Sequence, residues 1–174
     1  FQPTPITTSF DSAINQLEMD LVRKVKEYLA FRAGMQEIFT YPWMTDSFVN
    51  AILPNTDGVL ALSTPPSPTE KYLRSTLLPN ICKAIVKNER NFPEFDIFEE
   101  AQIFRDTDYT SEYSEIEKLP YQRKHLGCAF AGKSDDIGTL FRRAKGIIED
   151  MPRYTHMEGF TFAKVEKPYW ADET

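Results

Sequence analysis

Two long runs of strand-type residues, separated by an acidic connection, constrain the fold of this chain more than any other feature. The first run is 94–105 and the second is 123–132. Apolar residues in these runs include Phe95, Ile97, Ile103, Phe104, Leu126, Cys128 and Phe130. The runs predict an antiparallel pair, joined by an exposed connection (106–120) that is longer than a tight hairpin needs. Such a pair needs further elements to cover its apolar faces.

Three segments have apolar residues at the three- and four-residue steps of an amphipathic helix. They are 11–33, 77–90 and a segment from 135 or 136 to 150. Thr8 or Ser9 is expected to cap the first helix, and Gly34 to end it. The residues expected on the buried faces are Ile14, Leu17, Leu21, Val25, Tyr28 and Leu29, then Leu78, Ile81, Ile85 and Val86, then Ile137, Leu140, Phe141, Ala144 and Ile148.

Shorter elements complete the expected order. Strands are predicted at 36–41, 59–63 and 154–165, and a short helix at 46–53. Prolines at positions 65, 66 and 68 predict an extended connection before the second long helix. This order of elements indicates an α+β fold, in which helices pack on a largely antiparallel sheet. We expect residues 1–174 to form a single domain.

Composition and charge exclude several classes of protein. The 26 acidic and 20 basic residues give a net charge of −6, which argues against general binding to a phosphate backbone. Cys82 and Cys128 lie in apolar contexts and are expected to be free thiols of a reducing compartment. No run of about 18 apolar residues and no signal peptide is present, so we expect a cytoplasmic protein without a membrane contact. The chain lacks an initial Met and stops soon after a strand-like run, so we expect an excised piece.

Two blocks carry a family resemblance. Residues 72–80 read Tyr-Leu-Arg-Ser-Thr-Leu-Leu-Pro-Asn, and residues 95–104 read Phe-Asp-Ile-Phe-Glu-Glu-Ala-Gln-Ile-Phe. Weaker blocks begin at Gly34 (Gly-Met-Gln-Glu-Ile-Phe-Thr-Tyr) and at His125. In this order they resemble the catalytically silent, class II synthetase-like module of the phenylalanyl-tRNA synthetase β subunit, over roughly residues 10–170. The chain departs from the family pattern at Asn80, where the family has Gly, and at 100–102, where it has Ile-Gly-Arg.

The resemblance implies a class II aminoacyl-tRNA synthetase-like fold and a function. This domain would be a non-catalytic scaffold and subunit-contact module of phenylalanine–tRNA ligase, an ATP-dependent enzyme assembled as a heterotetramer of two α and two β subunits. Its partner would be the α subunit, which aminoacylates tRNA(Phe) and holds ATP and Mg²⁺. The domain itself would bind no cofactor and would meet tRNA only through the full assembly. The editing and tRNA-docking modules and the end of the synthetase-like fold are absent from this sequence.

The resemblance assigns structural or interface roles rather than catalytic or metal-binding ones. The motif positions are Arg74, Leu77, Leu78, Pro79, Phe98, Glu99 and Phe104. An arginine fork matches a carboxylate, so Arg74 can contact a buried carboxylate such as Glu99, or it can be an exposed residue at a helix entry. Glu99 and Glu100 are adjacent on a strand and therefore point to opposite faces, which argues against a shared metal or acid–base site.

Other polar and aromatic residues leave alternatives open. Lys83, Lys87 and Arg90 form a basic stripe that can meet RNA or an acidic partner, or can be a solvated helix face. Both histidines, His125 and His156, lack the neighbours of a triad or a metal site and are expected to be structural. The aromatic residues that can contact another subunit, or pack locally, are Trp43, Phe48, Tyr109 and Tyr113.

Two further functions are alternatives to the scaffold. The first is a free-standing paralogue that binds a small molecule or a protein partner outside translation. The second, an independent hydrolase, finds no nucleophile, metal cluster or phosphate loop to support it. Apolar surface and an open edge at strand 154–165 also predict that the isolated chain self-associates, most simply as a two-fold dimer.

Overall fold

The computed structural model describes residues 16–52, 58–109, 119–132 and 137–163. Its elements in chain order are helix α1 (Leu17–Glu27), π-helical turn η1 (Tyr28–Arg32), strand β1 (Gln36–Glu37), strand β2 (Trp43–Met44), helix α2 (Asp46–Ile52), strand β3 (Tyr72–Leu73), helix α3 (Leu78–Asn88), strand β4 (Phe95–Tyr109), strand β5 (Leu119–Ala131) and helix α4 (Ile137–Thr155). None of the helices in these ranges is long and apolar enough to cross a bilayer.

The antiparallel pair expected from the sequence is the centre of the fold. Strands β4 and β5 pair from Phe95–Ala131 to Tyr109–Leu119, and Phe98 lies opposite Cys128. Both strands are longer than expected, because they continue into the segment 106–120 that was predicted to be a connection. Pairing continues there past a shift of register between residues 105 and 108.

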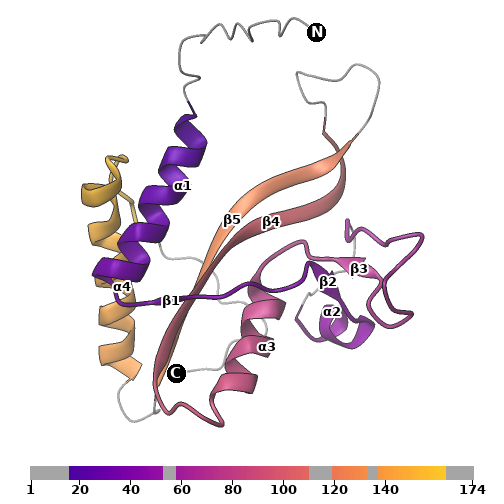
Figure 1. Ribbon diagram of the computed structural model, residues 1–174, viewed down its shortest axis with the longest axis horizontal. Coiled ribbons are helices and arrows are strands. Elements are labelled where there is room, and N and C mark those ends of the chain that lie inside the picture. Colours follow the sequence, from indigo (N-terminus) through magenta and orange to yellow (C-terminus); the bar gives the residue numbers. More distant parts are fainter. Residues whose placement is uncertain (1–15, 53–57, 110–118, 133–136, 164–174) are drawn as a thin grey trace, which may run out of the picture.

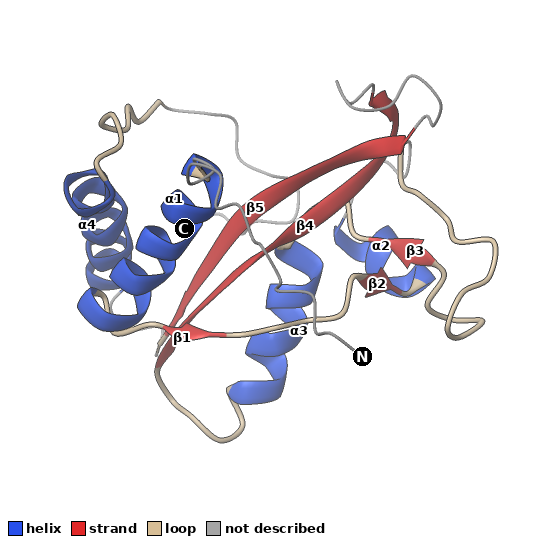
Figure 2. Ribbon diagram, turned by 45° about the horizontal axis from the view of Figure 1, so that its top comes forward, coloured by secondary structure: helices blue, strands red, loops and turns tan. Residues whose placement is uncertain are grey.

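Helices cover both faces of this strand pair, as Figures 1 and 2 show. Helices α1 and α4 lie side by side on one face, where Phe98 packs against Leu29 and Met151. Helix α3 lies on the other face, where Leu77 and Ile81 form a second core. Successive side chains of a strand alternate between faces, so each helix layer receives every second residue of β4. The fold is α+β with an antiparallel-dominated sheet, as predicted.

The prediction of a strand at 154–165 is wrong. Helix α4 continues to Thr155, past Pro152, and residues 156–163 contain no strand. The ring of Tyr154 stacks on Tyr28 at 5.2 Å between centroids, and Thr155 is buried. Tertiary packing of these residues therefore outweighs the cost of a proline inside the helix. His156, which follows the last helical residue, has a φ of +59°.

Three shorter predictions also need correction. Strand β1 has only two residues, and it pairs with β4 in parallel. The segment 59–63 forms no strand and contributes only a bridge between Ala61 and Tyr72. A two-stranded sheet, β2 with β3, was not expected, because Trp43 precedes a predicted helix and Tyr72 follows a proline-rich segment. Each of these strands is two residues long, too short for a recognisable alternation.

The helices expose much of the apolar face that their periodicity predicts. In α1 and η1, Tyr28 and Leu29 are buried, but Leu17 is 71% exposed. The other expected core residues that are in fact exposed are Leu21, Leu78, Val86, Ile137 and Phe141. Periodicity identifies an apolar face but not what covers it, and the described sheet covers only part of each face. Residues 11–15 of the first predicted helix lie outside the described residues.

Candidate functional site

Arg74 and Glu99 form a buried ion pair between two elements far apart in the sequence. Arg74 directly follows β3, and Glu99 lies in the middle of β4. Arg74 Nη1 is 3.0 Å from Glu99 Oε1, and the two side chains are 6% and 1% exposed. Arg74 Nε also donates a hydrogen bond of 2.8 Å to the carbonyl of Gln102. The first of the two interpretations of Arg74 is therefore correct.

Thr40 and Asn80 complete the hydrogen bonds around this ion pair. Glu99 accepts from the backbone N–H of Thr40 at 3.0 Å and from its hydroxyl at 2.8 and 2.9 Å. The Thr40 hydroxyl in turn accepts from Arg74 Nη1 and from Asn80 Nδ2, each at 3.0 Å. Asn80 Nδ2 also donates to the carbonyl of Tyr41. The network joins the segment after β1, the entry to α3 and the centre of β4.

Sequence reasoning did not assign Thr40 or Asn80 to this network. The available signals were the position of Thr40 inside a matched block and the departure of Asn80 from the family pattern. Neither signal shows which side chains meet. A buried carboxylate needs several donors, so the presence of a buried Glu99 is the physical reason to look for them.

The remaining motif residues divide between core and surface. Leu77, Pro79 and Phe98 are buried, Phe104 is half-buried, and Leu78 is 40% exposed. Glu100, on the opposite face of β4 from Glu99, pairs with Lys26 of α1 at 3.2 Å. The two adjacent carboxylates therefore point apart, as predicted. Phe104 also holds the motif together through its backbone N–H, which donates to the carbonyl of Arg74 at 2.9 Å.

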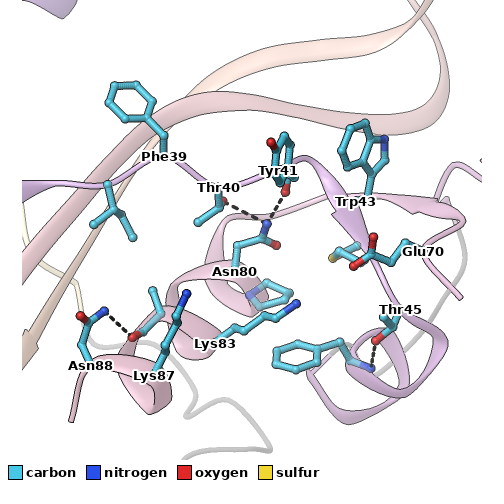
Figure 3. A pocket seen from close by; sticks show the side chains of 15 residues that line it. Phe39, Thr40, Tyr41, Trp43, Thr45, Glu70, Asn80, Lys83, Lys87 and Asn88 are labelled. Carbon is cyan, nitrogen blue, oxygen red and sulfur yellow. Dashed lines mark hydrogen bonds between the residues drawn. The ribbon is translucent and has the colours of Figure 1, made fainter. Parts of the chain in front are cut away.

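A cavity of about 370 Å³ lies beside the network, between residues 38–48 and helix α3 (Figure 3). Lys83 and Lys87 of the basic stripe line it, and Arg90 does not. Trp43 and Phe48 line it as well, so these two aromatic residues belong to a local cavity. The side chains of the other two candidates, at positions 109 and 113, lie outside the described residues.

The described part of the chain holds no group of three or more His, Cys, Asp or Glu side chains that is suited to a metal ion. Burial raises the pKa of the Cys128 thiol to about 11, which disfavours the reactive thiolate. Burial and the positive charges of Arg105 and Arg123 lower the pKa of His125.

Comparison with known proteins identifies the family. A family model described as the phenylalanyl tRNA synthetase beta chain CLM domain matches residues 3–173. The chain belongs to this family. It is also 28% identical, over 150 residues, to the phenylalanine–tRNA ligase beta subunit of Oceanobacillus iheyensis. That match covers 79% of this chain and 18% of the relative, so the chain spans less than a fifth of the β subunit that it matches.

Solved structures agree with this CLM domain in fold. The pyrrolysyl tRNA synthetase PylSc of Desulfitobacterium hafniense gives a TM-score of 0.63 at 17% identity, covering 81% of this chain and 47% of that one. The prolyl-tRNA synthetase of Giardia lamblia gives 0.59 at 15% identity, covering 78% and 28%. At such identities the likeness concerns the fold alone, and it confirms the predicted class II synthetase-like fold of the CLM domain.

Proposed function

We propose that this CLM domain is a non-catalytic scaffold and subunit-contact module of the β subunit of phenylalanine–tRNA ligase. In this proposal the α subunit binds ATP and Mg²⁺ and aminoacylates tRNA(Phe), within a cytoplasmic heterotetramer of two α and two β subunits. The CLM domain supports that subunit through its helices and sheet, and tRNA reaches it only through the full assembly.

The observation that carries the proposal is the exposed apolar face of α1, η1 and α4. Leu17 is 71% exposed, Phe31 85% and Phe141 66%, although α1 and α4 lie side by side and share a core (Figure 1). Large exposed apolar side chains on adjacent helices are typical of a surface that another chain covers. A second helix layer from a partner would bury them.

The burial and hydrogen bonding of the Glu99 carboxylate on β4 support a non-catalytic role. Holding Mg²⁺ or a substrate ammonium group requires a carboxylate that the ligand can reach. The side chain of Glu99 is 1% exposed, and its two oxygens already accept hydrogen bonds from Thr40 and Arg74. This carboxylate stabilises the fold and is not accessible to a ligand.

Two measurements test the proposal. The chain alone should give no phenylalanine-dependent exchange of pyrophosphate into ATP, and it should co-elute with the α subunit of the same enzyme. Phe31→Ser and Phe141→Ser should weaken that complex, whereas Phe92→Ser, at a residue 55% exposed beyond α3, should not. Exchange activity from the chain alone, or an α-subunit complex that both substitutions leave unchanged, would contradict the scaffold role.

The alternative function, a free-standing paralogue that binds a small molecule, is favoured by one observation. The cavity of about 370 Å³ lies within the roughly 300–1,000 Å³ range of small-molecule sites. The full-length gene product distinguishes the two functions. Flanking editing and tRNA-docking modules would establish the ligase, and a reading frame without them would establish the paralogue.

A further inference from the structure

We propose that the outer edge of the extended segment 38–41 accepts an acidic peptide of a partner chain as an added β-strand. The peptide would lie in the cavity between this segment and helix α3. Three features point to this ligand: unpaired backbone groups on the edge, two lysines on α3, and aromatic side chains on the other side of the segment. The site uses residues other than those of the proposed subunit contact and does not depend on it.

The segment that follows β1 binds β4 with every second residue. The N–H of Ile38 donates to the carbonyl of Phe98 at 2.8 Å, and the N–H of Thr40 donates to the carboxylate of Glu99 at 3.0 Å. In an extended chain, the backbone groups of successive residues point to opposite edges. The intervening residue, Phe39, therefore turns its N–H and C=O away from β4.

The outward backbone groups face helix α3 and are unpaired. Asn80 Nδ2 of α3 donates to the carbonyl of Tyr41 at 2.6 Å, so the outer edge is turned towards this helix. The N–H and C=O of Phe39 and the N–H of Tyr41 have no hydrogen-bond partner among the described residues. Such an edge is a template for a further strand, whose own backbone would satisfy these groups.

One face of α3 favours acidic side chains on the added strand. Among the α3 residues that line the cavity are Asn80, Lys83, Ala84 and Lys87 (Figure 3). Their three- and four-residue steps place them on the helix face that Asn80 turns towards the edge. Neither lysine makes an ion pair within the described residues, although the chain has a net charge of −6. Glu70 is the only carboxylate among the described lining residues, so the charge of this face is complementary to an acidic peptide.

The opposite side of the segment favours apolar side chains. The rings of Phe39, Tyr41 and Trp43 point away from α3 (Figure 3), as expected for alternate residues of an extended chain. Phe39 is 79% exposed and Tyr41 75%, and the Tyr41 ring stacks on Trp43 with 5.0 Å between centroids. Side chains of neighbouring strands pair across the ladder, so every second residue of the added strand would pack beside these rings. The ligand is therefore a peptide in which acidic and apolar residues alternate.

The buried network holds the segment in place before a peptide binds. Thr40 is hydrogen-bonded to Glu99, Arg74 and Asn80. Both of the charged partners are buried. An edge that is already extended and fixed loses little conformational freedom on binding, which favours affinity.

Titration of the ¹⁵N-labelled chain with the peptide acetyl-Glu-Val-Glu-Val-Glu-amide, followed by NMR, tests the proposal. We expect saturable shifts, and at saturation hydrogen exchange should slow at the amides of Phe39 and Tyr41, because they gain acceptors. The amides of Ile38 and Thr40 already have acceptors, so their exchange should change little. The proposal is overturned if no shift saturates up to the solubility limit of the peptide. It is also overturned if the exchange of Phe39 and Tyr41 is unchanged.

Two control peptides separate strand addition from attraction by charge alone. The fully N-methylated form of the same peptide keeps its side chains and charge but has no backbone donor in the ladder. Acetyl-Lys-Val-Lys-Val-Lys-amide keeps the donors and reverses the charge. Neither should bind in the range in which the first peptide saturates. An N-methylated peptide that binds as tightly as the first would refute the added strand, and a lysine peptide that does so would refute the preference for acid.

Charge-matched variants locate the acidic contact. Lys83→Met and Lys87→Met should each weaken binding about two- to fivefold, as expected for the loss of one exposed ion pair. Arg90→Met removes the same charge just beyond the same helix, outside the cavity lining, and should leave the affinity unchanged. If both lysine variants bind the acidic peptide as tightly as the parent chain, α3 does not select the ligand and the proposal is wrong.

Discussion

Removing one partner of the Arg74–Glu99 ion pair should destabilise the protein far more than removing a surface ion pair. In Arg74→Met, Glu99 keeps its two donors on Thr40 but loses the cation with which it pairs. In Glu99→Leu, Arg74 keeps the carbonyl of Gln102 but loses the carboxylate with which it pairs. Each variant leaves an unpaired charge in the interior, which costs about 3–5 kcal/mol.

The double variant separates the ion pair from the rest of the packing. If the two costs were independent, their sum would be about 6–10 kcal/mol. Arg74→Met combined with Glu99→Leu removes both charges and leaves mainly the backbone N–H of Thr40 without its acceptor, at about 1–3 kcal/mol. The double variant should therefore be no less stable than either single variant. The coupling free energy between the two positions should exceed about 3 kcal/mol.

Urea and thermal unfolding, followed by circular dichroism, measure these free energies. For a chain of 174 residues, each kcal/mol corresponds to about 2–4 °C in Tm. Lys124→Met is the control, because its ion pair with Glu18 is largely exposed and is worth at most about 1 kcal/mol. The reasoning fails if both single variants behave like this control. It also fails if the two effects add within about 0.5 kcal/mol.

Three further perturbations test the packing, and one tests the assembly. Leu77→Ala and Phe98→Ala should each cost about 2–5 kcal/mol, measured as a lower urea midpoint, because both residues are buried. Gly127→Ala should cost about 1–3 kcal/mol, since a Cβ there would clash with Ile81 Cδ1, and adding Ile81→Val should restore part of the loss. Stability should fall as the pH rises from 9.0 towards 11, because the Cys128 thiol ionises in the unfolded chain first, and Cys128→Ala should weaken that dependence. Light scattering over a concentration series should show self-association through the exposed apolar faces, and a monomer throughout would count against such faces being contact surfaces.

The sequence predicted the centre of the fold better than its edges. Strands β4 and β5 are long enough for their apolar residues to identify them, and the two strands pair antiparallel as the pattern predicts. Strand β1 pairs over two residues only. A strand so short shows no alternation of apolar and polar residues, so its parallel pairing with β4 could not be predicted. The predicted end of helix α4 is wrong. Pro152 favours a break in the helix, whereas packing of Tyr154 against Tyr28 favours its continuation. Local sequence does not contain that tertiary contact.

For the candidate site, the sequence indicated which residue types can interact but not which side chains are in contact. The types of Arg74 and Glu99 made a buried pair possible, but the sequence left an exposed arginine equally open. Thr40 and Asn80 gave no comparable signal, because small polar side chains serve equally well in caps and loops. Their place in the network depends on three separated segments meeting at Glu99, which only the fold determines.

Several apolar residues that the sequence predicts to be buried are exposed in the structure. Their exposure bears on the function. Helical periodicity predicted that Leu21 and Phe141 face an apolar surface, and within the described residues Leu21 is 36% and Phe141 66% exposed. The turn η1, which continues α1, buries Tyr28, and α4 buries Met151, in the core that contains Phe98 of the sheet. Each helix therefore has an apolar face wider than the sheet covers. A stripe of this width is stable in water when a second layer covers the remainder. The chain spans less than a fifth of the β subunit that it matches, so in the proposed ligase the rest of such a subunit and the α subunit would be the available layers.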